Sequence, residues 1–181
     1  MKSRIFVILA TLAFPLGAEA QLKSTGPAYE PDMNIRMRGF RERVLLDTMA
    51  VWQPLPGSPI QTFRHALQVL DSLKIPVSYA DSIRGVIHHY GFVARSQLAK
   101  KPISQSFRCG MGLSGDYADT WRVSIAYAIF VKPDGGNSKI GVAFITGAND
   151  VEGVSKPAVQ CGSTGRLEQT IAKAVGLRSI Q

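Results

Sequence analysis

One stretch of the chain has the apolar period of a helix. Its apolar side chains recur at steps of three and four residues, which places them on one face: Ile60, Phe63, Leu67, Leu70 and Leu73. Before them, Ser58, Pro59 and Gln61 form an S-x-x-Q capping box with proline at the first helical position. Since Pro76 cannot continue a helix, we expect an amphipathic helix from Pro59 to just before Pro76.

A second stretch, 121–131, has the period of a strand. One face carries large apolar residues, namely Trp121, Val123, Ile125, Tyr127 and Ile129, and the other carries Arg122, Ser124, Ala126 and Ala128. "KPDGGNSK" follows, and its Asp-Gly and Gly-Gly pairs tolerate the positive φ that a tight hairpin needs. Because "IGVAFITGA" comes next, the pattern predicts a long antiparallel hairpin.

Weaker patterns fill the remainder of the chain. "VLLDTMAVW" suits a first strand, and Val77–Tyr79 with Arg84–Val93 suits a short hairpin around Ala80, Asp81 and Ser82. The stretches 95–110, 110–120 and 149–160 are expected to be loops, the first with at most one helical turn. A last helix should begin near Ser163 or Thr164 and bury four residues: Leu167, Ile171, Ala174 and Val175.

The predicted order is strand, helix, hairpin, long hairpin and helix. Antiparallel strands with one apolar face need a cover, and two amphipathic helices supply it. We therefore expect an α+β fold with a single curved antiparallel β-sheet and two amphipathic helices packed on one face. Residues 40–181 should form this single domain.

The first twenty residues have the layout of a signal peptide. Lys2 and Arg4 precede an apolar run from Ile5 to Phe14, and Ala18-Glu19-Ala20 is a small-x-small cleavage signature. No cysteine stands at that site, so a lipoprotein is not expected, although an uncleaved anchor stays an alternative. Residues 21–39 read as a flexible polar linker. The expected location is periplasmic or secreted.

The formal charge of +8 at pH 7 suits anionic partners. For an exported chain these are an envelope protein or an anionic membrane surface, and nucleic acid is not expected. The charge is concentrated in "IRMRGFRERV", where Arg36, Arg38, Arg41 and Arg43 form either a docking patch or a solvated face.

The two cysteines, Cys109 and Cys161, decide how the chemistry is interpreted. At a helix start near Arg166, Cys161 would have a depressed pKa and act as a nucleophile. "CGSTGR" resembles the phosphate loop of cysteine-dependent phosphatases, but it has four residues between cysteine and arginine where that family has five. Exported cysteines usually pair, and these two flank the long hairpin, whose ends lie close together. We expect a Cys109–Cys161 disulfide worth roughly 4 kcal/mol in the chain-entropy model.

Other candidate chemistry is sparse. His88 and His89 are neighbours on an expected strand, so they face opposite sides and cannot chelate one metal together; one should be exposed and the other half-buried. His65 suits a surface histidine on the first helix. Asp116 and Asp119 form either a carboxylate pair for glycoside hydrolysis or ordinary turn aspartates. No G-x-S-x-G, P-loop, dinucleotide or H-E-x-x-H motif occurs, so we expect no enzyme, no cofactor and no metal.

Two resemblances can be stated. The layout resembles the helix-grip arrangement, which includes the modules of the envelope lipoprotein BamC, although the lipidation cysteine is missing here. From Ile103 onward, a "CG" pair, a hairpin and "GVSKPAVQCGSTGRLEQTIA" are similar to uncharacterised exported bacterial proteins with this two-cysteine C-terminal module. This second resemblance implies an envelope protein with a structural disulfide.

These observations favour a non-enzymatic envelope binding or assembly module, such as an extrinsic subunit of a membrane complex. The alternative is a small-molecule or lipid carrier with a pocket between sheet and helix. The sequence leaves the oligomeric state open.

Overall fold

The computed structural model describes residues 46–150 and 157–179 of the chain. The expected signal peptide (1–20), the polar linker (21–39) and the basic stretch with Arg36, Arg38, Arg41 and Arg43 lie outside the described residues.

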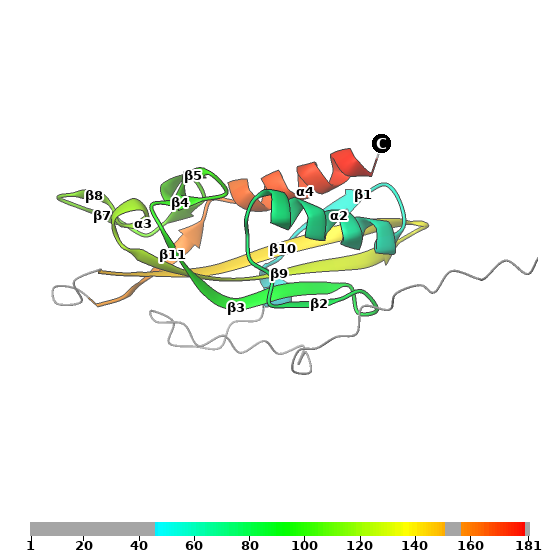
Figure 1. Ribbon diagram of the computed structural model, residues 1–181, viewed down its shortest axis with the longest axis horizontal. Helices are drawn as coiled ribbons and strands as arrows, with labels where there is room; N and C mark the ends of the chain where they lie inside the picture. The colour runs from blue at the N-terminus through cyan, green and yellow to red at the C-terminus, as the bar shows by residue number, and fades with distance from the viewer. Residues whose placement is uncertain (1–45, 151–156, 180–181) are drawn as a thin grey trace, which may run out of the picture.

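One antiparallel sheet runs through the described part of the molecule (Figure 1). Its strands are ordered β5-β4-β3-β9-β10-β11-β6, while β1 also pairs with β10 and β2 with β3. Their bounds are β1 Val51–Leu55, β2 Tyr79–Asp81, β3 Val86–Arg95, β4 Gln97–Leu98, β5 Lys101–Pro102, β6 Phe107–Arg108, β9 Arg122–Asp134, β10 Asn137–Asn149 and β11 Val159–Ser163. The expected antiparallel sheet is confirmed.

The long hairpin β9–β10 forms the centre of the sheet. It pairs from Asn137↔Asp134 to Asn149↔Arg122 and turns through Gly135 and Gly136. Both glycines have positive φ, 52° and 89°, which is the requirement of a two-residue hairpin connection. The turn sequence thereby sets the register of the two strands that carry most of the core.

Helix α2 (Pro59–Ser72) begins and ends as its sequence predicts. Ser58 accepts the N–H of Gln61 while the Gln61 side chain bonds back to Ser58, so the capping box is present. At the other end, the N–H groups of Lys74 and Ile75 donate to Asp71 and Leu70, the pattern of a Schellman motif. Lys74 occupies its left-handed position with φ 57°.

Helix α4 (Arg166–Arg178) begins later than expected. Its N-cap is Gly165 in the left-handed conformation, and neither Ser163 nor Thr164 is the cap. Ser163 Oγ instead accepts the Gly165 N–H, and both residues precede the first turn. Leu167, Ile171 and Val175 are buried as predicted; Ala172 and Glu168 are also buried, and Ala174 only partly.

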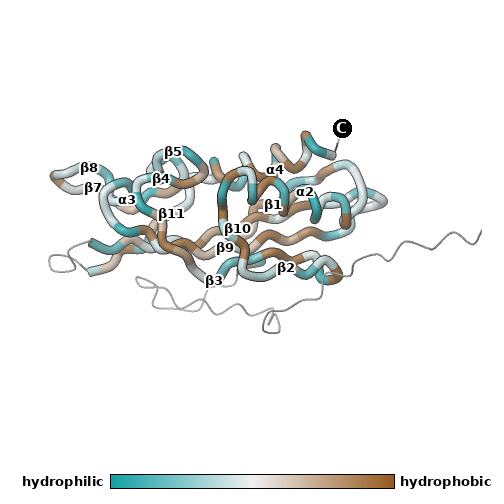
Figure 2. The backbone as a smooth tube through the Cα atoms, viewed as in Figure 1, coloured by the Kyte–Doolittle hydropathy of each residue, from teal (hydrophilic) through white to brown (hydrophobic). Residues whose placement is uncertain are grey.

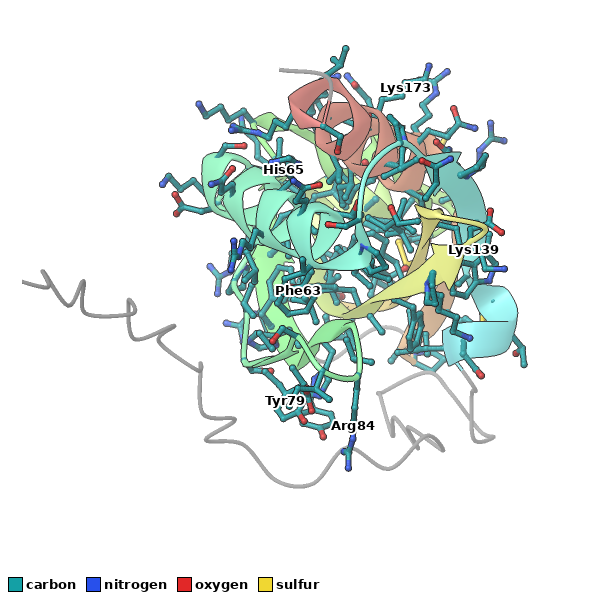
Figure 3. All side chains as sticks on the ribbon, turned by 90° about the vertical axis from the view of Figure 1, so that its right-hand side faces the viewer. Phe63, His65, Tyr79, Arg84, Lys139 and Lys173 are labelled. Carbon is teal, nitrogen blue, oxygen red and sulfur yellow. A yellow bond between two sulfur atoms is a disulfide. The ribbon has the colours of Figure 1, made fainter. Side chains whose placement is uncertain are left out.

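Both helices pack side by side on one face of the sheet (Figures 1 and 3). Phe63 points from α2 toward the strands, and His65 lies higher on the same helix (Figure 3). The main core lies between the two layers, where Phe63, Leu70, Ile129 and Ile171 are all buried. Figure 2 shows the hydrophobic residues gathered on the central strands. The predicted pair of helices on one face is therefore confirmed.

The opposite face of the sheet is more buried than its sequence suggests. Ala126 and Ala128, placed on the polar side of the pattern, are buried in a second cluster together with Phe130. Leu46 and Trp52 pack on this cluster. The alternation of apolar and polar residues distinguishes the two faces of a strand. It does not show whether another part of the chain covers the more polar face.

The expected first strand over 44–52 is wrong in its first half. Residues Leu46–Met49 form a single helical turn, α1, and the strand β1 begins at Val51. Only Leu46 is buried in that turn, so these residues have no alternating face to place on a sheet. β1 instead pairs with Ser138–Val142 of β10, with Trp52 lying over Gly141.

The stretch expected to be loops is built from very short elements. These are β4, β5, the 3₁₀ turn η1 (Ile103–Gln105), β6, a two-stranded hairpin of β7 (Met111–Gly112) and β8 (Gly115–Asp116), and α3 (Tyr117–Thr120). The expected single helical turn corresponds to η1. We call residues 95–122, together with 159–166, the irregular end.

Candidate functional site

Cys109 and Cys161 form the predicted disulfide. Their Cα atoms are 4.2 Å apart and 52 residues separate them in the sequence. The bond joins the end of β6 to β11, which pair with each other through Arg108↔Gly162. Since the described residues include no free cysteine, Cys161 has no thiol with which to act as a nucleophile.

The two neighbouring histidines differ more than predicted. His88 is fully buried, stacked on Tyr79 with ring centroids 4.7 Å apart and with the Tyr90 ring edge-on. The expectation that one histidine is exposed is therefore wrong, because the first three residues of β3, Val86 to His88, are buried on both faces of the strand. Burial, and secondarily the neighbouring His89, lower the pKa of His88 to about 4. His88 is neutral at pH 7.

The remaining sequence candidates have structural partners. Asp116 Oδ1 accepts the Ala118 N–H and caps α3. Asp119 accepts the backbone N–H of Ser104 at 2.9 Å and its hydroxyl at 2.6 Å. His65 Nδ1 lies 3.2 Å from Ser179 Oγ, between α2 and the end of α4. These hydrogen bonds account for the three side chains as parts of the fold.

One buried carboxylate had no sequence signal. Glu168 lies in the first turn of α4, is buried, and accepts the hydroxyl of Ser163 at Oε1. Within the described residues, Oε2 has no hydrogen-bond partner. The pair Ser163–Glu168 connects β11 to α4 directly after the disulfide.

A hollow lies beside the β4–β5 hairpin. Its central part has a volume of about 270 Å³ and lies between the end of α2, the first turns of α4 and residues 98–106. A part of about 580 Å³ continues along β3, and a part of about 430 Å³ continues toward β6 and the start of α4. The parts adjoin because the central one shares Leu98 with the first and Arg166 with the second.

We call this hollow the basic recess, since every charged residue described in its lining is a cation. The cations come from separate segments of the chain: Lys74, Arg95, Lys100, Lys101, Arg108, Arg166 and Lys173. Among the described lining residues there is no aspartate, glutamate, histidine or cysteine. Figure 3 shows Lys173 on the outer side of α4.

Within the described part of the chain, these cations are poorly neutralised. Only Lys74 has a recorded carboxylate partner within the described residues, Asp71 at 3.2 Å, and that pair is strongly exposed. A concave surface of one charge sign over apolar walls focuses the electrostatic field. Buried Leu98 and Leu167 supply such walls. The recess is therefore suited to attract and hold an anion.

The backbone around the recess adopts unusual conformations. In the described chain, the non-glycine residues with positive φ are Lys74, Ser96, Ala99 and Lys100, and all four lie in or directly beside its lining. Ala99 and Lys100 connect β4 to β5, where Asn-Gly is the usual choice. Strained residues of this kind gather at functional sites, and here they turn the lysine pair of the hairpin toward the hollow.

No family model matches the sequence, and no curated protein is significantly similar to it. Within the described residues, no helix has the length and apolarity that crossing a membrane requires. No group of three or more metal-ligating side chains is found in the same residues. The candidate site therefore rests on the geometry of the recess alone.

Proposed function

We propose that this protein is an exported, non-enzymatic binding module of the cell envelope that holds an anionic group of a partner protein in the basic recess. The single observation that carries the proposal is the convergence on one hollow of cations from β3, the β4–β5 hairpin, β6 and α4, none of which has an ion-pair partner among the described residues. Export is supported by the leader-like first twenty residues and by the disulfide, which is typical of oxidising compartments.

The residue types in the recess favour binding over catalysis. Its described polar groups are lysine, arginine, serine, threonine and glutamine. A hydrolytic site needs a nucleophile paired with a base that a third group orients. Asp119 and Glu168 accept the hydroxyls of the lining residues Ser104 and Ser163, and the described lining supplies no histidine as a base. Guanidinium and ammonium groups are instead suited to carboxylate, phosphate or sulfate recognition.

A second candidate follows from the apolar walls of the central part. Leu73, Leu98 and Leu167 line it below the cationic rim, and about 270 Å³ admits a small molecule. The carrier hypothesis then takes the form of a small amphipathic anion between the helices and the β4–β5 hairpin. The space between sheet and helices is occupied by packed side chains, including Phe63 and Ile171.

The test is affinity capture from the native envelope with three forms of the mature protein. The first is the wild type, the second is Lys101→Glu/Arg166→Glu/Lys173→Glu, and the third is a matched control, Arg64→Glu/Lys132→Glu/Arg178→Glu. All three control cations are exposed and lie outside the described recess lining. Mass spectrometry of bound proteins and native mass spectrometry of bound small molecules identify what is held.

A protein recovered with the wild type and the control, but lost with the recess variant and at high salt, supports the binding module. A small anion that follows the same pattern favours the carrier instead. Equal recovery with all three forms would overturn the proposal, because the charge of the recess would then not contribute to binding.

A further inference from the structure

The hairpin β7–β8 projects from one end of the molecule and carries exposed apolar side chains (Figure 1). Met111 is 77% exposed and Leu113, at the tip, is fully exposed. Figure 2 shows hydrophobic colour at that tip. The hairpin forms a two-stranded sheet of its own, paired through Met111↔Asp116 and Gly112↔Gly115, and is separate from the main sheet. We call residues Met111–Asp116 the apolar finger.

The finger is held at its base and does not hang from a loose loop. It follows Cys109 of the disulfide by two residues, and the Tyr117 N–H donates to the Gly110 carbonyl at 3.0 Å. The Tyr117 ring stacks on Trp121 with centroids 4.0 Å apart. A Cβ at Gly112 would lie 2.6 Å from that ring. The finger therefore presents its apolar side chains from a fixed root.

Arginines lie close to the finger in the sequence. Arg108 precedes Cys109, and Arg122 follows α3 directly after Trp121. Arg122 lies opposite Arg95 in the β3–β9 register, and both are exposed. Like charges directly opposite each other across a strand pair are unfavourable, and an anionic surface would relieve that repulsion. The aspartate at the root, Asp116, already caps α3.

We propose that the apolar finger inserts into the interfacial region of an anionic lipid bilayer, with Arg95, Arg108 and Arg122 facing the headgroups. Apolar side chains beside cations are the combination that binds peripheral proteins to anionic membranes. Two apolar side chains on a narrow convex tip cover far less than the roughly 800 Å² per partner of a stable protein interface. A fluid bilayer requires no matching pocket. Arg95 and Arg108 also line the basic recess, but this proposal does not depend on the recess having a protein partner.

The test is sedimentation with vesicles made of equal parts phosphatidylglycerol and phosphatidylcholine, using the mature chain with its disulfide intact. Met111→Ser/Leu113→Ser should weaken binding by about tenfold or more, because the transfer free energy of even one such side chain corresponds to that factor. Ile83→Ser is the matched control. Ile83 is 96% exposed in the turn before β3, and the β3–β9 register places it at the other end, near Val131.

The depth to which the finger enters the bilayer is measured with the variant Leu113→Trp. Vesicles should shift its added emission to the blue, and brominated acyl chains should quench it, whereas Ile83→Trp should respond to neither. Vesicles of phosphatidylcholine alone should bind at least tenfold more weakly if the arginines face anionic headgroups.

Unchanged vesicle binding by the double-serine variant, or no quenching of Leu113→Trp, would overturn the proposal. If the double-serine variant no longer captured an envelope protein but still bound vesicles, the finger would be assigned to a protein pocket. That result would overturn the membrane proposal equally. The recess variant Lys101→Glu/Arg166→Glu/Lys173→Glu separates the two proposals, since quenching of Leu113→Trp in that background should persist.

Discussion

The helix-covered part of the molecule and the irregular end are stabilised in different ways. Under α2 and α4, the sheet is long and regular, and one continuous core joins Phe63, Leu70, Ile129 and Ile171. At the irregular end, strands of two residues alternate with turns. There Ile103, Phe107 and Ala118 still belong to the same core. The disulfide and side-chain to backbone hydrogen bonds, such as those of Asp119 and Thr164, additionally hold the chain in place.

This difference indicates where specific surface features can develop. A regular core restricts its residues to packing, whereas a covalently fixed irregular segment can hold charges and apolar groups that contribute little to stability. Most of the recess lining and the whole of the apolar finger belong to the irregular end. The regular part then serves as the platform that positions both surfaces.

The disulfide should give the largest effect. Cys109→Ser/Cys161→Ser is expected to lower the free energy of unfolding by about 4 kcal/mol, because the bond closes a long loop in the unfolded chain. Chemical denaturation followed by circular dichroism measures the loss. In this variant, amide hydrogen exchange should increase first in residues 95–122. If exchange rose uniformly over α2 and β9 as well, the two regions would not be energetically distinct.

Leu70→Ala tests the helix-covered part of the molecule. Leu70 is fully buried in α2, and its truncation should lower the free energy of unfolding by about 3 kcal/mol through lost transfer energy and a cavity. Vesicle binding of the folded fraction should stay at the wild-type level. A parallel loss of vesicle binding would mean that core packing controls the finger.

The lowered pKa of His88 predicts that the helix-covered part of the molecule loses stability in acid. The pKa of His88 is about 4 in the folded protein against about 6.5 in an unfolded chain, so protons bind preferentially to the unfolded state. The stability is therefore fully present above pH 6.5 and is lost as pH falls toward 4, by about 3 kcal/mol.

The control for this acid effect is His88→Phe, which keeps a ring against Tyr79. Unfolding free energies of both proteins between pH 7 and pH 4 give the difference. The variant should have a flatter pH profile, and identical profiles would exclude His88 as the cause.

The smallest effect concerns the strained connection between β4 and β5. Ala99→Asn/Lys100→Gly fits the positive φ of 51° and 63° and should raise the free energy of unfolding by about 1 kcal/mol. Because it removes one recess cation, partner capture should weaken while stability increases. A thermal melt and the capture assay, run on the same protein, test both. Lower stability would contradict the assignment of strain to this turn.

The periodic elements of the fold could be predicted from the sequence, and the reason is local. The capping box of α2, the double glycine of β9–β10 and the two cysteines act through neighbours in the chain or through one covalent bond. The burial of His88 could not be predicted, since it depends on what covers the second face of β3. Nor could the cap of α4, where Gly165 begins the helix although two hydroxyl residues precede it.

The basic recess could not be predicted from the sequence either, for a different reason. Its cations are spread from Lys74 to Lys173, and only Lys100-Lys101 are adjacent. They meet because the β4–β5 hairpin turns through Ala99 and Lys100 without the glycine that marks such a turn. The arginine-rich stretch Arg36–Arg43, the clearest charge signal in the chain, stays a prediction. The apolar finger was hidden because "MGLSGD" reads as a flexible loop.

The separation of Cys109 and Cys161 by 52 residues imposes an order on folding. The whole β9–β10 ribbon lies between them in the sequence, so pairing of this ribbon brings the two thiols within reach of each other. The basic recess and the apolar finger, which adjoin the disulfide, would then take their final form only after the central ribbon has paired.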